Sequence, residues 1–137
     1  MKMPYTGGCC CGAIRYECSA EPLMAGICHC RECQRSAGSA SVAHMAVPES
    51  ALKVTGEVRY HDYKADSGNI ASHGFCPRCG SHVLGKSTGM PDLMTIRAAS
   101  LDDPSRFKPA MHVYTASAQP WDYMNLALPK FPKMPPM

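Results

Sequence analysis

The sequence has few charged residues and no cluster of one sign. Charged residues make up 18% of the 137 residues, and a net charge of +3 is spread along the chain. Nucleic-acid binding needs a concentrated basic surface, so we expect no nucleic-acid partner. No segment approaches the ~20 apolar residues of a membrane span, and the start MKMPYTGGCC lacks the apolar core of a signal peptide. We therefore expect a cytoplasmic protein without a membrane partner; no pattern predicts an oligomeric state.

Long segments with helical periodicity are also lacking. Eleven glycines and twelve prolines interrupt the chain, while apolar residues at 45% suffice for a core. Short β-rich segments bounded by turn residues predict strands, and no boundary divides residues 1–137. We expect a single all-β (mainly β) domain with short helical turns. The expected strands are 13–18, 52–54, 70–75, 93–97 and 111–114, and the expected helical turns are 31–35, ended by Gly38, and 102–106. The Pro-rich segment 129–137 is expected to be a tail, either strapped down or frayed.

Nine cysteines are the main chemical signal. The count is odd, no export signal is seen, and cytosolic thiols stay reduced, so metal binding or thiol chemistry is expected rather than disulfides. The clusters are Cys9-x-Cys11, Cys28-x-Cys30-x-x-Cys33 and Cys76-x-x-Cys79. Each has the spacing of a chelating motif.

Two of these clusters supply four thiolates. In an extended strand Cys9 and Cys11 share a face, while Cys10 points away and is not expected to be a ligand. Cys76 and Cys79 converge in a turn. We predict that these two pairs hold a structural zinc ion. A redox dithiol is the alternative for Cys76-x-x-Cys79.

The remaining cluster predicts a second zinc ion held by Cys28, Cys30 and Cys33. Three protein ligands leave a fourth position for substrate, as in catalytic zinc sites, and a thiol bound there loses its proton near neutral pH. Two alternatives stay open. A histidine (His29, His44 or His73) closes the site, or this cluster pairs with Cys76 and Cys79.

Other residues carry weaker expectations. Cys18 is expected in the core, and Trp121 is expected to be a packing anchor or a pocket wall. Zinc-dependent base deaminases need an HxE motif, which the sequence lacks. A site of three thiolates is soft and suits sulfur ligands better than hydrolytic water.

The segments GGCCCGAIRYE, CHCRECQRSAGSA, FCPRCGSH, HVYTASAQPWDYM and LPKFPKMPP occur in this order. Together they resemble the glutathione-dependent formaldehyde-activating enzyme family, also called the centromere protein V domain family. The resemblance runs from about Gly7 to Pro135. It implies a β-tent fold with a structural zinc at Cys9, Cys11, Cys76 and Cys79 and a catalytic zinc at Cys28, Cys30 and Cys33.

The resemblance also implies a carbon–sulfur lyase that acts on a small thiol such as glutathione and a small aldehyde. The activity that names the family joins formaldehyde to glutathione to give S-hydroxymethylglutathione. Arg35, Lys86 and Arg97 are candidates for holding the carboxylates of glutathione, against the alternative of surface charges. The alternative function is a non-enzymatic zinc module that binds a protein partner. A redox or metal-storage protein is a weaker alternative.

Overall fold

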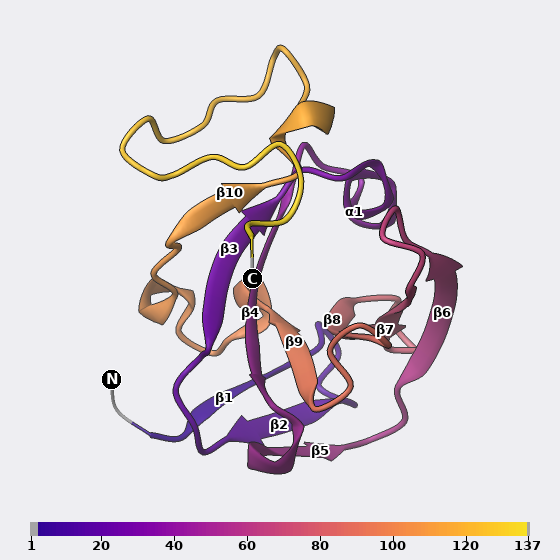
Figure 1. Ribbon diagram of the computed structural model, residues 1–137. Coiled ribbons are helices and arrows are strands. Elements are labelled where there is room, and N and C mark those ends of the chain that lie inside the picture. The colour runs from indigo at the N-terminus through magenta and orange to yellow at the C-terminus, as the bar shows by residue number, and fades with distance from the viewer. Residues whose placement is uncertain (1–2, 137) are drawn as a thin grey trace.

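The computed structural model describes residues 3–136 (Figure 1). Most of the regular structure in this range is β-strand. The strands are β1 (Tyr5–Gly8), β2 (Arg15–Cys18), β3 (Met24–Cys28), β4 (Val42–Pro48), β5 (Leu52–Thr55), β6 (Arg59–Lys64), β7 (Ile70–Phe75), β8 (His82–Ser87), β9 (Leu93–Arg97) and β10 (Met111–Val113). The helices are α1 (Arg31–Ala37) and the short 3-10 turns η1 (Glu49–Ala51), η2 (Ala98–Ser100), η3 (Pro104–Arg106) and η4 (Thr115–Ser117). The expectation of a mainly β protein is confirmed.

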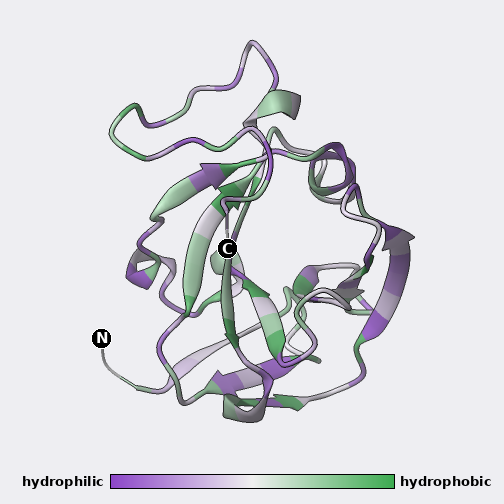
Figure 2. Ribbon diagram, viewed as in Figure 1, coloured by the Kyte–Doolittle hydropathy of each residue, from purple (hydrophilic) through white to green (hydrophobic). Residues whose placement is uncertain are grey.

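The strands form two sheets. The larger sheet has the order β10-β3-β4-β9-β8-β7-β6, and the smaller has the order β1-β2-β5. All neighbouring strands are antiparallel except β10, which runs parallel to β3. Figure 1 shows the smaller sheet below the larger one, and β6 at one edge of the larger sheet. Figure 2 shows β6 as largely hydrophilic, which suits an exposed edge strand because charged side chains oppose pairing with other chains.

The hydrophobic core lies between the two sheets. Tyr5, Tyr16 and Cys18 from β1 and β2 pack against one face of the larger sheet, to which β4 contributes Met45 and Val47. The Tyr16 hydroxyl remains hydrogen-bonded to Ser100 Oγ at 2.7 Å, so its polar atom is satisfied inside the core. Burial raises the pKa of Tyr16 to about 12. Cys18 is fully buried in this core, as expected.

Several predicted elements are found with small shifts. Strands β7 and β9 have the predicted bounds, and α1 begins where predicted and ends at Gly38. Gly38 has φ 65, a conformation that costs glycine little, and its N–H bonds the Gln34 carbonyl. Strands β1, β3, β4, β6 and β8 were not predicted. Within the described residues no helix is long and apolar enough to cross a bilayer.

The C-terminal segment is strapped to the larger sheet rather than frayed. The Phe131 amide donates to the His112 carbonyl at 2.9 Å, and the Thr115 amide donates to the Phe131 carbonyl at 3.0 Å. The Tyr114 amide donates to the Lys133 carbonyl at 3.2 Å. These bonds carry residues 129–133 along β10 and hold Lys133 and Met134 beside the cavity described below.

Candidate metal centres

The first thiol cluster joins the end of β1 to the turn between β7 and β8. It contains Cys9, Cys11, Cys76 and Cys79, whose sulfur atoms lie within 4.8 Å of one another. The Cys9–Cys11 and Cys11–Cys76 sulfur distances are 3.7 and 3.8 Å. Four sulfurs in a regular tetrahedron around zinc are about 3.8 Å apart, given Zn–S bonds of about 2.3 Å. The donor set and its spacing therefore fit a closed zinc site.

Local hydrogen bonds favour thiolates in this cluster. Backbone amides donate to sulfur from Ile14 to Cys9 at 3.2 Å and from Arg78 to Cys76 at 3.4 Å. The Ser81 hydroxyl lies 3.2 Å from the Cys79 sulfur, and this contact lowers the pKa of Cys79 to about 5. Gly80, with φ 80, closes the turn, and its amide donates to the Cys76 carbonyl at 2.8 Å. The turn thus presents two sulfurs on one side.

The geometry of Cys9 and Cys11 differs from the prediction. Strand β1 ends at Gly8, and the Gly12 amide donates to the Cys9 carbonyl, so the two cysteines lie in a turn rather than an extended strand. The turn forms because Gly12 adopts φ 81, which an L side chain rarely does. It still brings both sulfurs together and leaves Cys10 exposed and outside the cluster.

The second cluster lies where β3 leads into α1. Cys28 ends β3, Cys30 is the residue before the helix, and Cys33 lies in its first turn. Cys30 caps the helix, because its sulfur accepts the Cys33 amide at 3.3 Å. The three sulfurs lie within 4.8 Å of one another. Among residues 3–136 no further histidine, carboxylate or cysteine atom joins this group. Cys76 and Cys79 belong to the first cluster, so the alternative pairing is not formed.

The close approach of the three thiols shifts their pKa values in opposite directions. Hydrogen bonds from Cys28 and then Cys33 lower the pKa of Cys30 to about 2. The hydrogen bond with Cys30 raises the pKa of Cys28 to about 12, and Cys28 in turn raises that of Cys33. The protein alone therefore stabilises one thiolate here. A cation is needed before all three sulfurs ionise, which is the condition of a zinc site.

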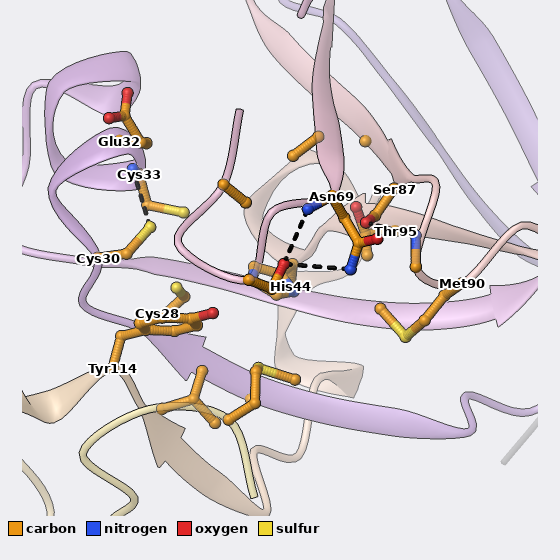
Figure 3. A pocket seen from close by; sticks show the side chains of 18 of the residues that line it. Cys28, Cys30, Glu32, Cys33, His44, Asn69, Ser87, Met90, Thr95 and Tyr114 are labelled. Atoms are coloured by element: carbon orange, nitrogen blue, oxygen red, sulfur yellow. Dashed lines mark hydrogen bonds between the residues drawn. The ribbon is translucent and has the colours of Figure 1, made fainter. Parts of the chain in front are cut away.

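The second cluster opens into a cavity of about 850 Å³ (Figure 3). The three cysteines, His44, His73 and Arg97 are among its lining residues. Desolvation by the surrounding protein lowers the pKa of His44 and of His73 to about 4, so both are neutral near pH 7. These histidines line the cavity without joining the sulfur cluster. The four cysteines of the first cluster do not line this cavity.

His29, the residue between Cys28 and Cys30, has contacts at its backbone amide, its backbone carbonyl and both ring nitrogens. Its amide donates to the Val113 carbonyl at 3.0 Å, and its carbonyl accepts the Gln34 side-chain amide at 2.6 Å. Its imidazole Nδ1 lies 3.1 Å from Asp122 Oδ2, and Nε2 lies 2.8 Å from His112 Nδ1. His29 and His112 are 1% and 3% exposed. Burial lowers the pKa of His29, so its ring is neutral near pH 7, with Nδ1 beside the Asp122 carboxylate and Nε2 hydrogen-bonded to His112.

Most of this network was not predictable from local sequence patterns. Gln34 extends it, since its side-chain amide also donates to the Ser117 carbonyl at 2.9 Å and its Oε1 accepts from Gln119 at 2.9 Å. Asp122 and Gln119 are far from the cysteines in sequence, so no local pattern connects them. The only local signal was the polar Gln34 on the buried face of a short helix.

Trp121 has a different setting from the one expected, and the three basic candidates differ from one another in their position relative to the cavity. Trp121 is 72% exposed and does not line the cavity, so it is neither a packing anchor nor a pocket wall. Arg35 is exposed on α1, away from the cavity. Lys86 borders the cavity, but its ammonium lies over the Tyr60 ring at 4.2 Å. Arg97 lines the cavity and has Ser36 Oγ as a neighbour at 3.3 Å.

The family model for glutathione-dependent formaldehyde-activating enzymes matches residues 4–117, which is most of the chain. The chain belongs to the glutathione-dependent formaldehyde-activating enzyme family. All three cysteine motifs lie within the matched residues, whereas Gln119 and Asp122 lie beyond them. The name of the family supports a lyase-type function related to glutathione and formaldehyde.

A solved structure has a similar fold. A crystal structure of a Rhodobacter sphaeroides protein superposes with a TM-score of 0.58 at 22% identity. The match covers 92% of this chain and 98% of that chain. At this identity the likeness concerns the fold alone, which places the family member described here in an architecture already seen in a crystal.

Proposed function

We propose that this family member is a zinc-dependent carbon–sulfur lyase that makes or breaks the adduct of a thiol with an aldehyde. Glutathione and formaldehyde are the first candidates. One observation carries the proposal: three gathered thiols line a cavity of about 850 Å³, while a cluster of four thiols lies outside it. The proposal treats residues 1–137 as one zinc-binding domain that acts in the cytoplasm, with Cys9, Cys11, Cys76 and Cys79 in a structural role.

In this proposal Cys28, Cys30 and Cys33 hold the second zinc ion and leave room for one substrate atom. A zinc ion bound there supplies a Lewis acid that favours the thiolate form of a substrate thiol. In the forward reaction a bond forms between the thiol sulfur and the aldehyde carbon. The thiol proton ends on the former carbonyl oxygen, so the product is a hydroxyalkyl thioether and no oxidant or reductant is needed. The lyase direction reverses these changes.

Arg97 is the proposed partner of the aldehyde oxygen. Its guanidinium is partly buried at the cavity wall, and among the described residues no carboxylate forms an ion pair with it. It retains hydrogen-bond donors beyond its contact with Ser36. A fixed cation beside the carbonyl stabilises the negative charge that develops on oxygen during attack. The neutral His44, which pairs with Arg97 across β4 and β9, does not compete as a cation.

The test is exchange spectroscopy of ¹³C-formaldehyde and glutathione at equilibrium, with and without protein. We expect the zinc-loaded protein to accelerate exchange between free aldehyde and adduct. Cys30→Ser should abolish the acceleration, whereas the matched control Cys10→Ser should keep it, because Cys10 is exposed and belongs to neither cluster. Equal acceleration by both variants would refute catalysis at the second cluster.

A second candidate function is a zinc module that binds a protein partner. It is favoured by the exposed side chains of Trp121, Tyr123 and Leu126, which are 72%, 87% and 83% exposed on the segment after η4. Exposed aromatic residues are frequent anchors at interfaces. If the protein is the proposed enzyme, Trp121→Ser should keep its exchange activity, since Trp121 does not line the cavity. Protein that binds two zinc ions but never accelerates exchange would favour this second function.

A further inference from the structure

The cavity floor changes character along the strands. Residues two apart on a strand face the same side, and three neighbouring strands contribute such residues to the cavity. Cross-strand pairs join Gly26 with His44 and His44 with Arg97, which forms a polar row near the cysteines. The next row joins Met24 with Ala46 and Ala46 with Thr95. The floor is therefore polar beside the thiols and apolar further along.

The apolar end is formed by long flexible side chains above small ones. Met24, Met90 and Leu93 line it, and Met111, which pairs with Gly26 of the polar row, lies beside it. A Cβ on Gly26 would lie 3.3 Å from Met111 Cγ, so the absence of a side chain there gives Met111 its space. Methionine side chains adapt to apolar ligands of varied shape. We call three residues, Met24, Met90 and Leu93, the apolar end of the cavity.

Polar side chains near the apolar end already have partners. Asn69 donates from Nδ2 to Ser67 Oγ at 3.1 Å (Figure 3). Ser87 Oγ accepts the Gly89 amide at 3.1 Å. Their groups do not need a polar ligand. Charged residues also lie at the border, where Lys133 Nζ is 2.7 Å from Asp66 Oδ2 and both side chains are mostly exposed. The cavity thus has a polar row beside its thiols, an apolar end further along the strands and a charged border.

Formaldehyde has no carbon substituent, so it places no group against the apolar end of the cavity. Burying a methylene yields about 0.8 kcal/mol, so an apolar wall that the aldehyde substituent reaches beyond the polar row discriminates by chain length. The thiol carrier, if it is a charged peptide, fits better toward the border, where Lys64 and Lys133 are exposed. The aldehyde substituent then has the apolar interior available.

We propose that the apolar end is a binding subsite for the aliphatic chain of an aldehyde of several carbons. This inference rests on the proposed lyase function and narrows its substrate class. The new carbon–sulfur bond forms as described above, with the thiol proton again ending on the aldehyde oxygen. Only the substituent on the reacting carbon differs, and it lies against Leu93 and the methionines.

The first test uses the wild-type zinc-loaded protein and hydroxyalkyl adducts of glutathione with propanal, butanal, pentanal and hexanal. We expect kcat/KM to rise about fourfold for each added methylene, or about 60-fold from propanal to hexanal, from the ~0.8 kcal/mol per buried methylene. A flat or falling series would overturn the subsite. Activity with formaldehyde alone would also overturn it while leaving the lyase function intact. No turnover of any adduct, formaldehyde included, would refute the lyase function and the subsite with it.

The second test compares Leu93→Asn with Leu23→Asn. Both replace leucine by a polar residue of similar size, but Leu23 is 63% exposed and does not line the cavity. We expect Leu93→Asn to lower the hexanal-to-propanal ratio of kcat/KM more than tenfold and Leu23→Asn to preserve it. Thermal unfolding shows whether each variant is folded. A folded Leu93→Asn with an unchanged ratio would overturn the proposal, and if this variant does not fold, the wild-type series decides.

Discussion

Replacing Asp122 with asparagine should weaken zinc binding at the second cluster selectively. The Asp122 carboxylate lies 3.1 Å from His29 Nδ1, and His29 links the cluster residues Cys28 and Cys30. The side chains are 15% and 1% exposed, so solvent screens their contact little. Asparagine has a similar size but no charge, so the change removes the carboxylate charge beside His29 while keeping the volume.

The magnitude follows from that single contact. A close polar contact with a charged group contributes at most about 1.5–3 kcal/mol, which corresponds to roughly a 10- to 150-fold change in an equilibrium constant. Residues that hold metal ligands in place from outside typically change metal affinity by a similar factor. The backbone of His29 remains held by Val113 and Gln34, so the cluster should persist with lower affinity rather than disappear.

The assay is competition between the protein and a chromophoric zinc chelator, which resolves two affinities per chain. We expect the affinity of the second cluster to fall and that of the first to stay unchanged. Asp66→Asn is the matched control, because it removes an exposed ion pair with Lys133. Asp122→Glu should restore part of the affinity. Equal weakening of both zinc sites, or no change at either, would refute the positioning role of Asp122.

Two further predictions concern the cysteines and the cavity histidine. Cys30→Ser should lose about one equivalent of zinc and stay folded. Cys79→Ser should fail to fold, because structural zinc contributes on the order of 10 kcal/mol to folding. Metal analysis and circular dichroism check both variants, and equal unfolding of the two would contradict the assigned roles. The folded-state pKa of His44, about 4, lies below its unfolded value, so its contribution to stability is complete above about pH 6.5 and is lost as pH falls toward 4. Denaturant unfolding with excess zinc should therefore show His44→Asn losing less stability than wild type over this range, by at most about 3 kcal/mol, and parallel losses would contradict it.

The thiol clusters were predictable because chelating spacing is local. Cys76 and Cys79 need only one tight turn, and Cys30 and Cys33 need only the first turn of α1 to bring their sulfurs together. The pairing of Cys9 and Cys11 with Cys76 and Cys79 followed from ligand counting. Its local geometry did not, because the positive φ of Gly12 makes a turn where a strand was expected.

The cavity and its polar supports were not predictable in the same way. Strand β3 reads MAGIC, and its Gly26 and Ala25 weaken any β signal, yet Gly26 leaves room on the cavity side and Ala25 packs against the core. His29 and Asp122 meet only after the segment beyond η4 folds back onto the start of α1. Trp121 was expected to be a packing anchor or a pocket wall. In the structure its neighbour Asp122 contacts the buried His29, while Trp121 itself is mostly exposed.

The most direct test of the account is the response of cobalt(II)-substituted protein to an added thiol. Cobalt takes the place of zinc and reports its ligands through its visible absorption. We predict two cobalt ions per chain, with glutathione changing the spectrum of the ion at Cys28, Cys30 and Cys33 and leaving the other unchanged, and no such change in Cys30→Ser. A single ion per chain, or two ions whose spectra ignore the thiol, would contradict an open three-thiolate site.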